Sequence, residues 1–306
     1  TGANVRADIN SALLAISSNN SGSSAPSTNY ASQFFANTTS NIMQLRNTAN
    51  NAHVNLFSLA GAPAFPLDGT INSINIGKGA NSVAGNTVVG EGALDASVTG
   101  GNNTAIGKNS LTALTSGINN TAMGSGSLEN NTTANNNTAI GVQALQDNTT
   151  GAGNTAIGRD ALEFNTTASN NTAVGLNSLT ANTTGTQNVA VGAFALDVNT
   201  TGNNNVSIGF ECLDANSTGN KNIGIGRNAL GSNTTADNNT AIGDLSLAAN
   251  TTGTRNTAVG SITLDTNTTG NDLTAIGFGA LTGNTTGSSN TANGVFALDV
   301  NTTGSN

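Results

Sequence analysis

Acidic side chains recur at one position of a repeated sequence unit, and paired carboxylates are the groups that hydrolyse most glycosidic bonds. Asp197 and Asp214 are one unit apart, near the separation that a retaining glycosidase uses. Other units hold Thr, Gln, Gly or Ala at this position, as a solvated face would. We therefore interpret these acids as surface charge that discourages lateral aggregation, and polysaccharide cleavage as the least favoured hypothesis. Seven acids lie five residues after a regularly spaced glycine: Asp95, Glu129, Glu163, Asp197, Asp214, Asp265 and Asp299.

Other side chains with catalytic potential are scarce. His53 is the only histidine, so one chain cannot form a Ser-His-Asp triad or a multi-histidine metal cluster. Cys212 is the only cysteine, which excludes an internal disulfide. It stands three residues after a repeat glycine, where every unit has a small residue, so we expect it to fill a narrow interior. The sequence predicts a protein that is not an enzyme, with no catalytic residue, cofactor or metal.

Two further patterns have both a binding and a structural interpretation. Phe194, Phe210, Phe278 and Phe296 follow a repeat glycine within two residues, at an expected turn. They could stack on sugars, but we expect them to pack between neighbouring chains. The many Asn-Thr-Thr triplets match the acceptor pattern for N-glycosylation, and a stacking role in the repeat already accounts for them.

The elements that position these residues belong to an array with a period of 17 residues. A fixed period predicts one structural unit repeated along an axis. The consensus unit is Asn-Thr-Ala-Ile-Gly-x-x-Ala-Leu-x-x-Asn-Thr-Thr-Gly-x-x, as in residues 154–170. Thirteen units each contribute one glycine: Gly90, Gly107, Gly124, Gly141, Gly158, Gly175, Gly192, Gly209, Gly226, Gly243, Gly260, Gly277 and Gly294. A leucine follows each by four residues, and we expect these to form a core ladder: Leu94, Leu111, Leu128, Leu145, Leu162, Leu179, Leu196, Leu213, Leu230, Leu247, Leu264, Leu281 and Leu298.

A unit this short suits one coil of a parallel β-solenoid, so the predicted fold is all-β with thirteen 17-residue coils. We call the residues at one position of successive coils a column. The leucines and the Ile or Val before each glycine (Ile106, Ile140, Val174, Val191, Ile276) are expected to form the dry seam. The Asn column before the strand, Asn103 through Asn256, is expected to stack amide on amide.

Each coil supplies only two large apolar residues, which makes a thin core. Each contributes at most about 1.5–3 kcal/mol when fully buried, whereas ordering one coil costs on the order of 25 kcal/mol. We therefore expect a second face, formed by Ala and Gly, to be buried against partner chains in an intertwined or side-by-side homotrimer.

The sequence divides into four segments. Residues 1–28 contain an amphipathic helix, expected over 5–16, and a linker over 17–28. Residues 29–66 are expected to form a small β-meander for attachment or trimerisation, with strands at 30–35, 42–46 and 52–59. Residues 67–85 form a junction and a capping coil, suggested by the shorter step from Gly77 to Gly90. Residues 86–306 form the solenoid shaft, and we expect further segments beyond both Thr1 and Asn306.

Composition excludes several partners. The net charge is −8, and the eight Lys and Arg are scattered singly, so no basic stripe is available for nucleic acid. No run of about eighteen apolar residues exists, so no membrane insertion is predicted. Charged residues are only 8% of the chain and aromatic residues 3%, which separates it from ordinary globular domains and from highly charged disordered chains.

Four motifs occur in order within the first sixty residues: Val5-Arg6-Ala7-Asp8-Ile9-Asn10, Asn19-Asn20-Ser21-Gly22, Ala25-Pro26-Ser27-Thr28 and Arg46-Asn47-Thr48-Ala49-Asn50-Asn51-Ala52. In order and spacing they strongly resemble the N-terminal module of bacteriophage tail-fibre proteins. Those fibres usually carry tryptophan where this chain has Phe34, Phe35 and His53. The Asn-Thr-Ala-Ile-Gly repeats are similar both to tail-fibre shafts and, more loosely, to the head repeats of trimeric autotransporter adhesins.

These resemblances imply a homotrimeric fibre with a β-rich shaft. We expect a structural subunit of the virion that binds tail or baseplate proteins through its N-terminal module and presents a tip to a host surface glycan or protein. The alternative is a bacterial surface adhesin or a self-assembling extracellular filament. An outer-membrane anchor or end-to-end polymerisation would favour that alternative.

Overall fold

The computed structural model describes five short strands before residue 72 and the continuous stretch 74–305, and the chain divides into two compact units, Thr1–Gly69 and Thr70–Asn306. In the first unit, β1 (Ser21–Gly22), β2 (Phe34–Asn37), β3 (Ile42–Arg46) and β4 (His53–Ser58) form one sheet in that order. β1 and β2 are parallel, whereas β2, β3 and β4 pair antiparallel. The helix expected over 5–16 lies outside the described residues, and β1 falls within the expected linker. The helix-plus-meander module stays a prediction.

The second unit begins with β5 (Gly69–Ile71), β6 (Ile74–Gly77), a 3-10 turn η1 (Ala80–Ser82) and β7 (Thr87–Gly90). β6 pairs antiparallel with β7, with Ile76 opposite Val89. The short step from Gly77 to Gly90 therefore joins two antiparallel strands through η1, and this segment contacts the first coil, where Nδ2 of Asn81 donates to the carbonyl of Val98 at 3.0 Å. The capping coil expected here stays a prediction. The thirteen residues of this step connect two antiparallel strands, whereas the later coils use seventeen residues to return to a parallel strand.

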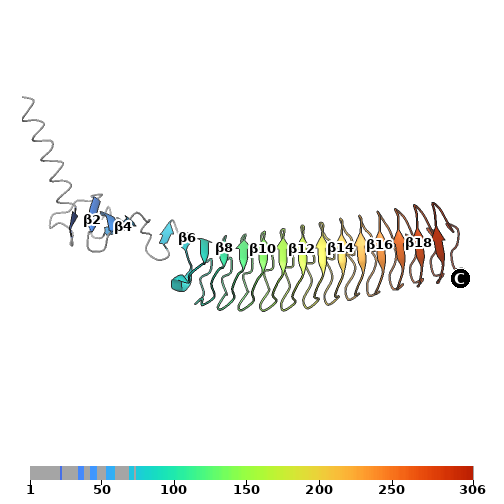
Figure 1. The fold of residues 1–306 in the computed structure, drawn as a ribbon, viewed down its shortest axis with the longest axis horizontal. Coiled ribbons are helices and arrows are strands. Elements are labelled where there is room, and N and C mark those ends of the chain that lie inside the picture. Colours follow the sequence, from blue (N-terminus) through green and yellow to red (C-terminus); the bar gives the residue numbers. More distant parts are fainter. Residues whose placement is uncertain are drawn as a thin grey trace, which may run out of the picture. The chain divides into compact units, whose positions relative to one another are not determined.

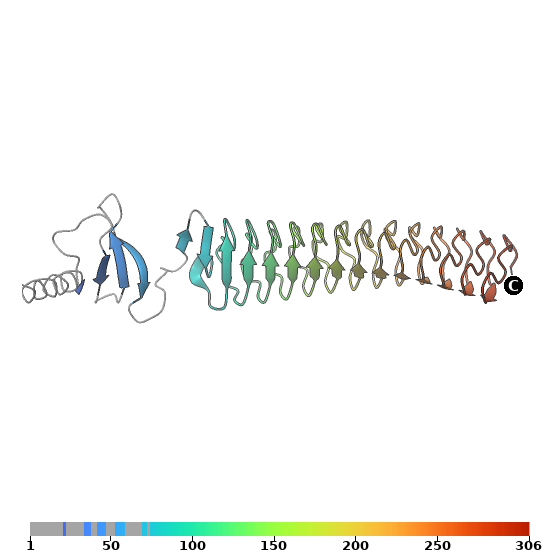
Figure 2. The ribbon, with the colours of Figure 1, turned by 90° about the horizontal axis from the view of Figure 1, so that it is seen from above.

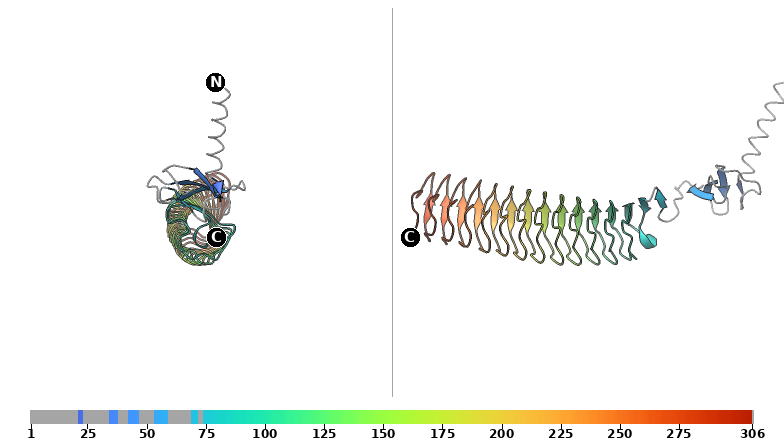
Figure 3. Two further views of the ribbon diagram at one scale, coloured as in Figure 1. Left: turned by 90° about the vertical axis from the view of Figure 1, so that its left-hand side faces the viewer. Right: turned by 180° about the vertical axis from the view of Figure 1, so that it is seen from behind.

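Thirteen parallel strands in the described array, β7 to β19, bound about twelve turns of a β-solenoid (Figure 1). This confirms the predicted all-β solenoid with 17-residue coils. Thirteen coils were predicted, and the thirteen strands bound about twelve complete turns. Neighbours pair in register, for example Thr138 with Thr155. The sheet twists gradually along the array, and the coils overlie one another in end view (Figures 2 and 3). The strands after β7 are β8 (Thr104–Ile106), β9 (Thr121–Met123), β10 (Thr138–Ile140), β11 (Thr155–Ile157), β12 (Thr172–Val174), β13 (Val189–Val191), β14 (Val206–Ile208), β15 (Ile223–Ile225), β16 (Thr240–Ile242), β17 (Thr257–Val259), β18 (Thr274–Ile276) and β19 (Thr291–Asn293).

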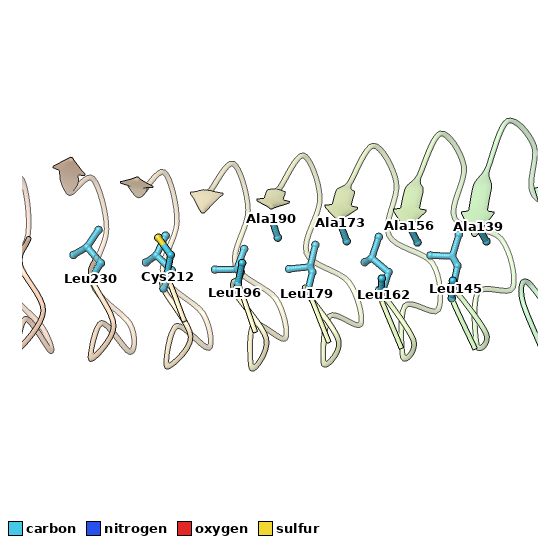
Figure 4. Packing of buried hydrophobic residues seen from close by; sticks show 14 of the residues in the cluster. Ala139, Leu145, Ala156, Leu162, Ala173, Leu179, Ala190, Leu196, Cys212 and Leu230 are labelled. Carbon is cyan, nitrogen blue, oxygen red and sulfur yellow. The ribbon is translucent and has the colours of Figure 1, made fainter. Parts of the chain in front are cut away.

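The core lies inside each coil, between the middle residue of the strand and the leucine. Ala156 and Leu162 are both fully buried, and the same two columns face each other in successive coils (Figure 4). Every repeat leucine from Leu94 to Leu281 is fully buried. Leu298, in the last described coil, is 50% exposed because no further coil covers it.

The outward position of the Ile and Val column corrects the predicted seam. Ile140 and Ile157 are each 37% exposed, and Ile276 is 43% exposed, whereas the Ala residues before them are buried. Strand side chains alternate between two faces, and the interior of so narrow a coil accepts only the smaller of the two residues. The expectation that an Ala and Gly face packs against partner chains is therefore wrong, because Ala156 and its equivalents fill their own coil.

The coil turns its corners at residues with positive φ. Asn170 (φ 62°), Asn177 (φ 52°) and Leu179 (φ 54°) lie in three such columns. The repeat glycine is required for two reasons: Gly158 has φ 137°, and a Cβ there would lie 2.3 Å from the carbonyl oxygen of Gly175. By contrast, the glycine after Asn-Thr-Thr does not have positive φ, which explains why Ala can replace it in three units.

Two buried Asn columns join the coils. In the column before the strand, the backbone N–H of Asn120 donates to Oδ1 of Asn103 at 2.9 Å, and Nδ2 of Asn120 donates to the carbonyl of Ala134 at 2.8 Å. The more regular amide-on-amide ladder belongs to the first residue of Asn-Thr-Thr, where Asn182 Nδ2 donates to Asn165 Oδ1 at 3.0 Å. The predicted amide stacking was in the Asn column before the strand, so the structure moves the more regular ladder to the first residue of Asn-Thr-Thr.

Candidate functional site

The acidic column forms part of an outer polar ladder. Glu129 accepts a hydrogen bond from Nε2 of Gln146 at 2.7 Å, and Asp265 accepts one from Oγ1 of Thr282 at 2.5 Å. Each donor occupies the same column one coil later. The acids therefore share their column with hydrogen-bonding neutral residues, in agreement with the interpretation of this column as a solvated face.

Asp197 and Asp214 are the pair that the sequence singled out as a possible glycosidase pair. Both are half-buried, in successive coils of the acidic column. Burial raises the pKa of Asp197, and the neighbouring Asp214 raises it further. Burial also raises the pKa of Asp214, with an added contribution from Glu211. The two environments shift both pKa values in the same direction, whereas an acid and a nucleophile need their pKa values separated.

Cys212 has a packing environment. It is buried, its thiol lies 3.4 Å from the carbonyl oxygen of Ala229, and burial raises its pKa to about 11. A Cβ on Gly224 in the next strand would lie 2.6 Å from the sulfur, so the glycine provides space for the larger side chain. His53 lies in β4, where side chains are not described. No group of three His, Cys, Asp or Glu residues that could hold a metal occurs in the described part of the chain.

The phenylalanines form pairs along the array within one chain. Phe194 and Phe210 meet edge to face with ring centroids 6.2 Å apart, and Phe278 and Phe296 do so at 5.3 Å. Phe210 and Phe278 remain 47% and 45% exposed. Each pair therefore retains an exposed aromatic surface.

Two Arg–Asp pairs outside the acidic column connect successive coils. Arg227 contacts Asp244 through two hydrogen bonds of 2.9 and 3.1 Å, and Arg255 contacts Asp272 through two of 2.6 and 2.8 Å. The hydrogen bond from Arg255 lowers the pKa of Asp272. These exposed pairs run parallel to the array and contribute little stability individually.

A column of short polar side chains was not recognised in the sequence. The residue eleven positions after the repeat glycine accepts a hydrogen bond from the backbone of the preceding coil: Asn220 N–H donates to Asp237 at 2.6 Å, and Ala152 N–H donates to Ser169 at 3.0 Å. The signal was present, because Asn, Asp, Ser and Thr predominate there. This column connects coils; it does not create a catalytic site.

The strand face is the outward surface of the solenoid sheet. It consists of two outward columns, the first and third residues of strands β7 to β19. The third-residue column is apolar up to β18, and neither column contains a charged residue. Its exposed members include Val89 (38%), Met123 (40%), Ile157 (37%), Ile208 (37%), Ile242 (37%) and Ile276 (43%).

The sequence contained a signal for this face. The second residue of each strand is small in nearly every coil, and uniformly small residues mark the inside of a narrow coil. The large residue beside it must then point outward. We identify the strand face as the candidate functional site, with the chemistry of a contact surface.

No protein-family model, no curated protein and no solved structure matches this chain. Within the described residues, no helix is long and apolar enough to span a membrane. The function must be argued from the solenoid and its outward faces.

Proposed function

We propose that this chain is a structural subunit of a homotrimeric virion fibre, a phage tail fibre, in which the solenoid is a rigid shaft for host attachment. The observation that carries this proposal is the strand face, a continuous apolar stripe along a solenoid whose interior is already filled. Such a stripe exposed to water favours association with another surface. Three chains that bury it against one another would remove this stripe from water.

The interior supports a mechanical role. Hydrogen bonds between coils continue from β7 to β19, and the buried Asn columns bond the coils side chain to side chain and to the backbone. Among the described residues, Asp160 Oδ1 is the one buried side-chain oxygen or nitrogen without a hydrogen-bond partner. A rod built this way resists bending because every coil is bonded to the next. Twelve steps of about 4.8 Å give it a length of roughly 60 Å.

The N-terminal resemblance supports the assignment to a virion. Under this proposal, residues before the solenoid attach the fibre to tail or baseplate proteins, and a tip binds a host surface glycan or protein. Three chains in one fibre would multiply weak receptor contacts through avidity. The chain itself performs no catalysis in this role.

Immunogold electron microscopy with an antibody against the solenoid tests the proposal. Virions of the phage that encodes the chain are the specimen, and uninfected host cells are the control. Gold on the tail fibres is the expected result. Gold on the envelope of uninfected cells, with none on virions, would establish the surface-adhesin alternative instead.

A further inference from the structure

Two columns of the array repeatedly carry Asn-x-Ser/Thr, the acceptor pattern for N-glycosylation. They differ in the exposure of the asparagine. In the buried class, Asn-Thr-Thr or Asn-Ser-Thr, the asparagine is 0% exposed in ten coils. In the exposed class, Asn-Asn-Thr, the first asparagine stands twelve residues after the repeat glycine and is exposed. The buried class comprises Asn131, Asn148, Asn165, Asn182, Asn199, Asn216, Asn233, Asn250, Asn267 and Asn284, and the exposed class Asn102, Asn119, Asn136, Asn170 and Asn238.

We propose that the solenoid forms only in chains whose buried-class asparagines carry no N-glycan. Folding of the array is thereby restricted to a compartment that leaves this acceptor pattern unmodified. The inference goes beyond the proposed function and does not rest on it, because it applies equally to a virion fibre and to a surface adhesin.

The atom that would receive the sugar is already hydrogen-bonded inside the coil. N-glycosylation replaces one hydrogen of the side-chain amide nitrogen, Nδ2, with a sugar carbon. Nδ2 has two hydrogens to donate, and in Asn182 it contacts two acceptors, Oδ1 of Asn165 at 3.0 Å and the carbonyl oxygen of Gly185 at 2.9 Å. Asn199 makes the same two hydrogen bonds, to Asn182 and Gly202. A glycan on Asn182 would therefore remove at least one of its two bonds.

The surroundings of the buried class leave no space for a sugar. Asn182 is 0% exposed, and Asn165 and Asn199 occupy the same column on either side of it. Successive coils are only about 4.8 Å apart, and N-linked glycans are bulky groups that belong at protein surfaces. A sugar ring on Nδ2 of Asn182 would have to separate neighbouring coils.

The exposed class provides a comparison within the same array. Asn119 lies in an outward column with positive φ, and its Nδ2 makes an exposed hydrogen bond of 3.2 Å to Oδ1 of Asn136. Other coils have long side chains in this column, at Gln187, Lys221 and Arg255. A glycan on Asn119 would extend into solvent and leave the buried columns intact. The position in the coil, not the acceptor pattern, decides which asparagine the fold can accept with a glycan.

Secretion from a eukaryotic cell tests the inference on the full chain. An added secretion signal brings both classes to the glycosylation enzymes before the chain folds. The folded fraction is isolated by its resistance to protease, and mass spectrometry locates its glycans. We expect no glycan on the buried class in this fraction. A protease-resistant chain with a glycan on Asn182 would overturn the inference.

Two matched variants separate the classes. One replaces the exposed third residue of every buried-class sequence by Ala, as in Thr184→Ala, and adds Ser207→Ala to remove the pattern at buried Asn205. The other replaces the exposed class by Gln, as in Asn119→Gln, since Gln187 occupies that column. We expect the first to raise the secreted folded yield about tenfold or more, because one unmet buried hydrogen-bonding group has an effect of that size. The second should leave the yield unchanged, and both should match the parent in bacterial cytoplasm. Equal secreted yields for the two variants would overturn the inference.

A chemical experiment tests the same step without a cellular enzyme. Asn182→Cys and Asn119→Cys are made separately in a Cys212→Ala background, since Ala161 fills the Cys212 column in another coil. Each is coupled to the iodoacetamide of N-acetylglucosamine in urea and then refolded. Coupling should lower the folded-to-unfolded ratio of Asn182→Cys about tenfold or more and leave that of Asn119→Cys unchanged, as measured by circular dichroism. Equal ratios for coupled and uncoupled Asn182→Cys would overturn the inference.

Discussion

The inside of the coil and the strand face use the same strand in opposite ways. Ala156 points inward against Leu162 and is fully buried, whereas Ile157, the next residue, points outward and is 37% exposed. The inward columns complete their contacts within one chain. The outward apolar column has no comparable intrachain cover, so the two faces separate the stability of the coil from its capacity to assemble.

Substitution of a repeat glycine should destabilise the coil more than any other change considered. Gly192→Ala would add a Cβ 2.4 Å from the carbonyl oxygen of Gly209 at φ 137°. Strain of about 1–3 kcal/mol and overpacking of a similar size together predict a loss of about 4 kcal/mol in the free energy of unfolding. Urea denaturation followed by circular dichroism measures it. Gly185→Ala is the control: a Cβ there would also lie 2.4 Å from a carbonyl oxygen, that of Gly202, but Gly185 does not have positive φ. Equivalent positions hold Ala134, Ala168 and Ala236, so we expect a smaller loss that lacks the contribution of backbone strain.

Truncating one side chain inside the coil and one on the strand face compares directly what each contributes to the stability of the chain. Leu179→Ala removes a fully buried side chain and should lower the free energy of unfolding by about 3 kcal/mol. Ile157→Ala should change the unfolding of the isolated chain by less than about 1 kcal/mol, and weaken association between chains instead. Denaturation measured at several protein concentrations separates the two effects. Equal losses independent of concentration would contradict the outward assignment of Ile157.

The Asn-Thr-Thr amide ladder should contribute less than the leucines. Asn182→Ala leaves Oδ1 of Asn165 without its donor and Nδ2 of Asn199 without its ladder acceptor, whereas the carbonyl of Gly185 keeps its hydrogen bond from Asn171. Each unmet buried group costs about 1–3 kcal/mol, so we expect a loss of about 2 kcal/mol. Thr184→Ala, an exposed neighbour in the same turn, is the control and should be nearly neutral. A loss for Thr184→Ala as large as for Asn182→Ala would show that the turn, not the ladder, is responsible.

The smallest effect is expected from pH on the acidic column. Burial raises the folded-state pKa of Asp197 above its unfolded value, so its ionisation opposes folding at neutral pH. That destabilisation should disappear as pH falls through the folded and then the unfolded pKa. Asp197→Asn should therefore stabilise the protein slightly at pH 7, by less than about 1 kcal/mol after allowance for solvent screening. The advantage should vanish at low pH in thermal unfolding; a larger advantage there would reverse the assigned sign.

The 17-residue period was enough to predict the coil. It did not show which columns point inward, because that depends on the size of the side chains. A glycine and a leucine at fixed spacing indicated 17-residue parallel coils, and the structure has them. The Ile column was placed inside because large apolar residues usually form cores, but Ala156 shows that this interior has room only for a smaller residue opposite Leu162. The positive φ of Leu179 had no sequence signal, because leucine rarely adopts it. The candidate site was predictable in part. Side chains alternate along a strand, so assigning the small middle residue to the inside places the residues on either side of it on the outward strand face.

Light scattering coupled to size-exclusion chromatography on the full chain tests most directly whether copies cover the strand face. One chain has a mass of 30.1 kDa, so a trimer has three times that, about 90 kDa. We predict a discrete species of that mass for the parent chain. A parent chain that elutes as a single 30.1 kDa species across concentrations would contradict the account.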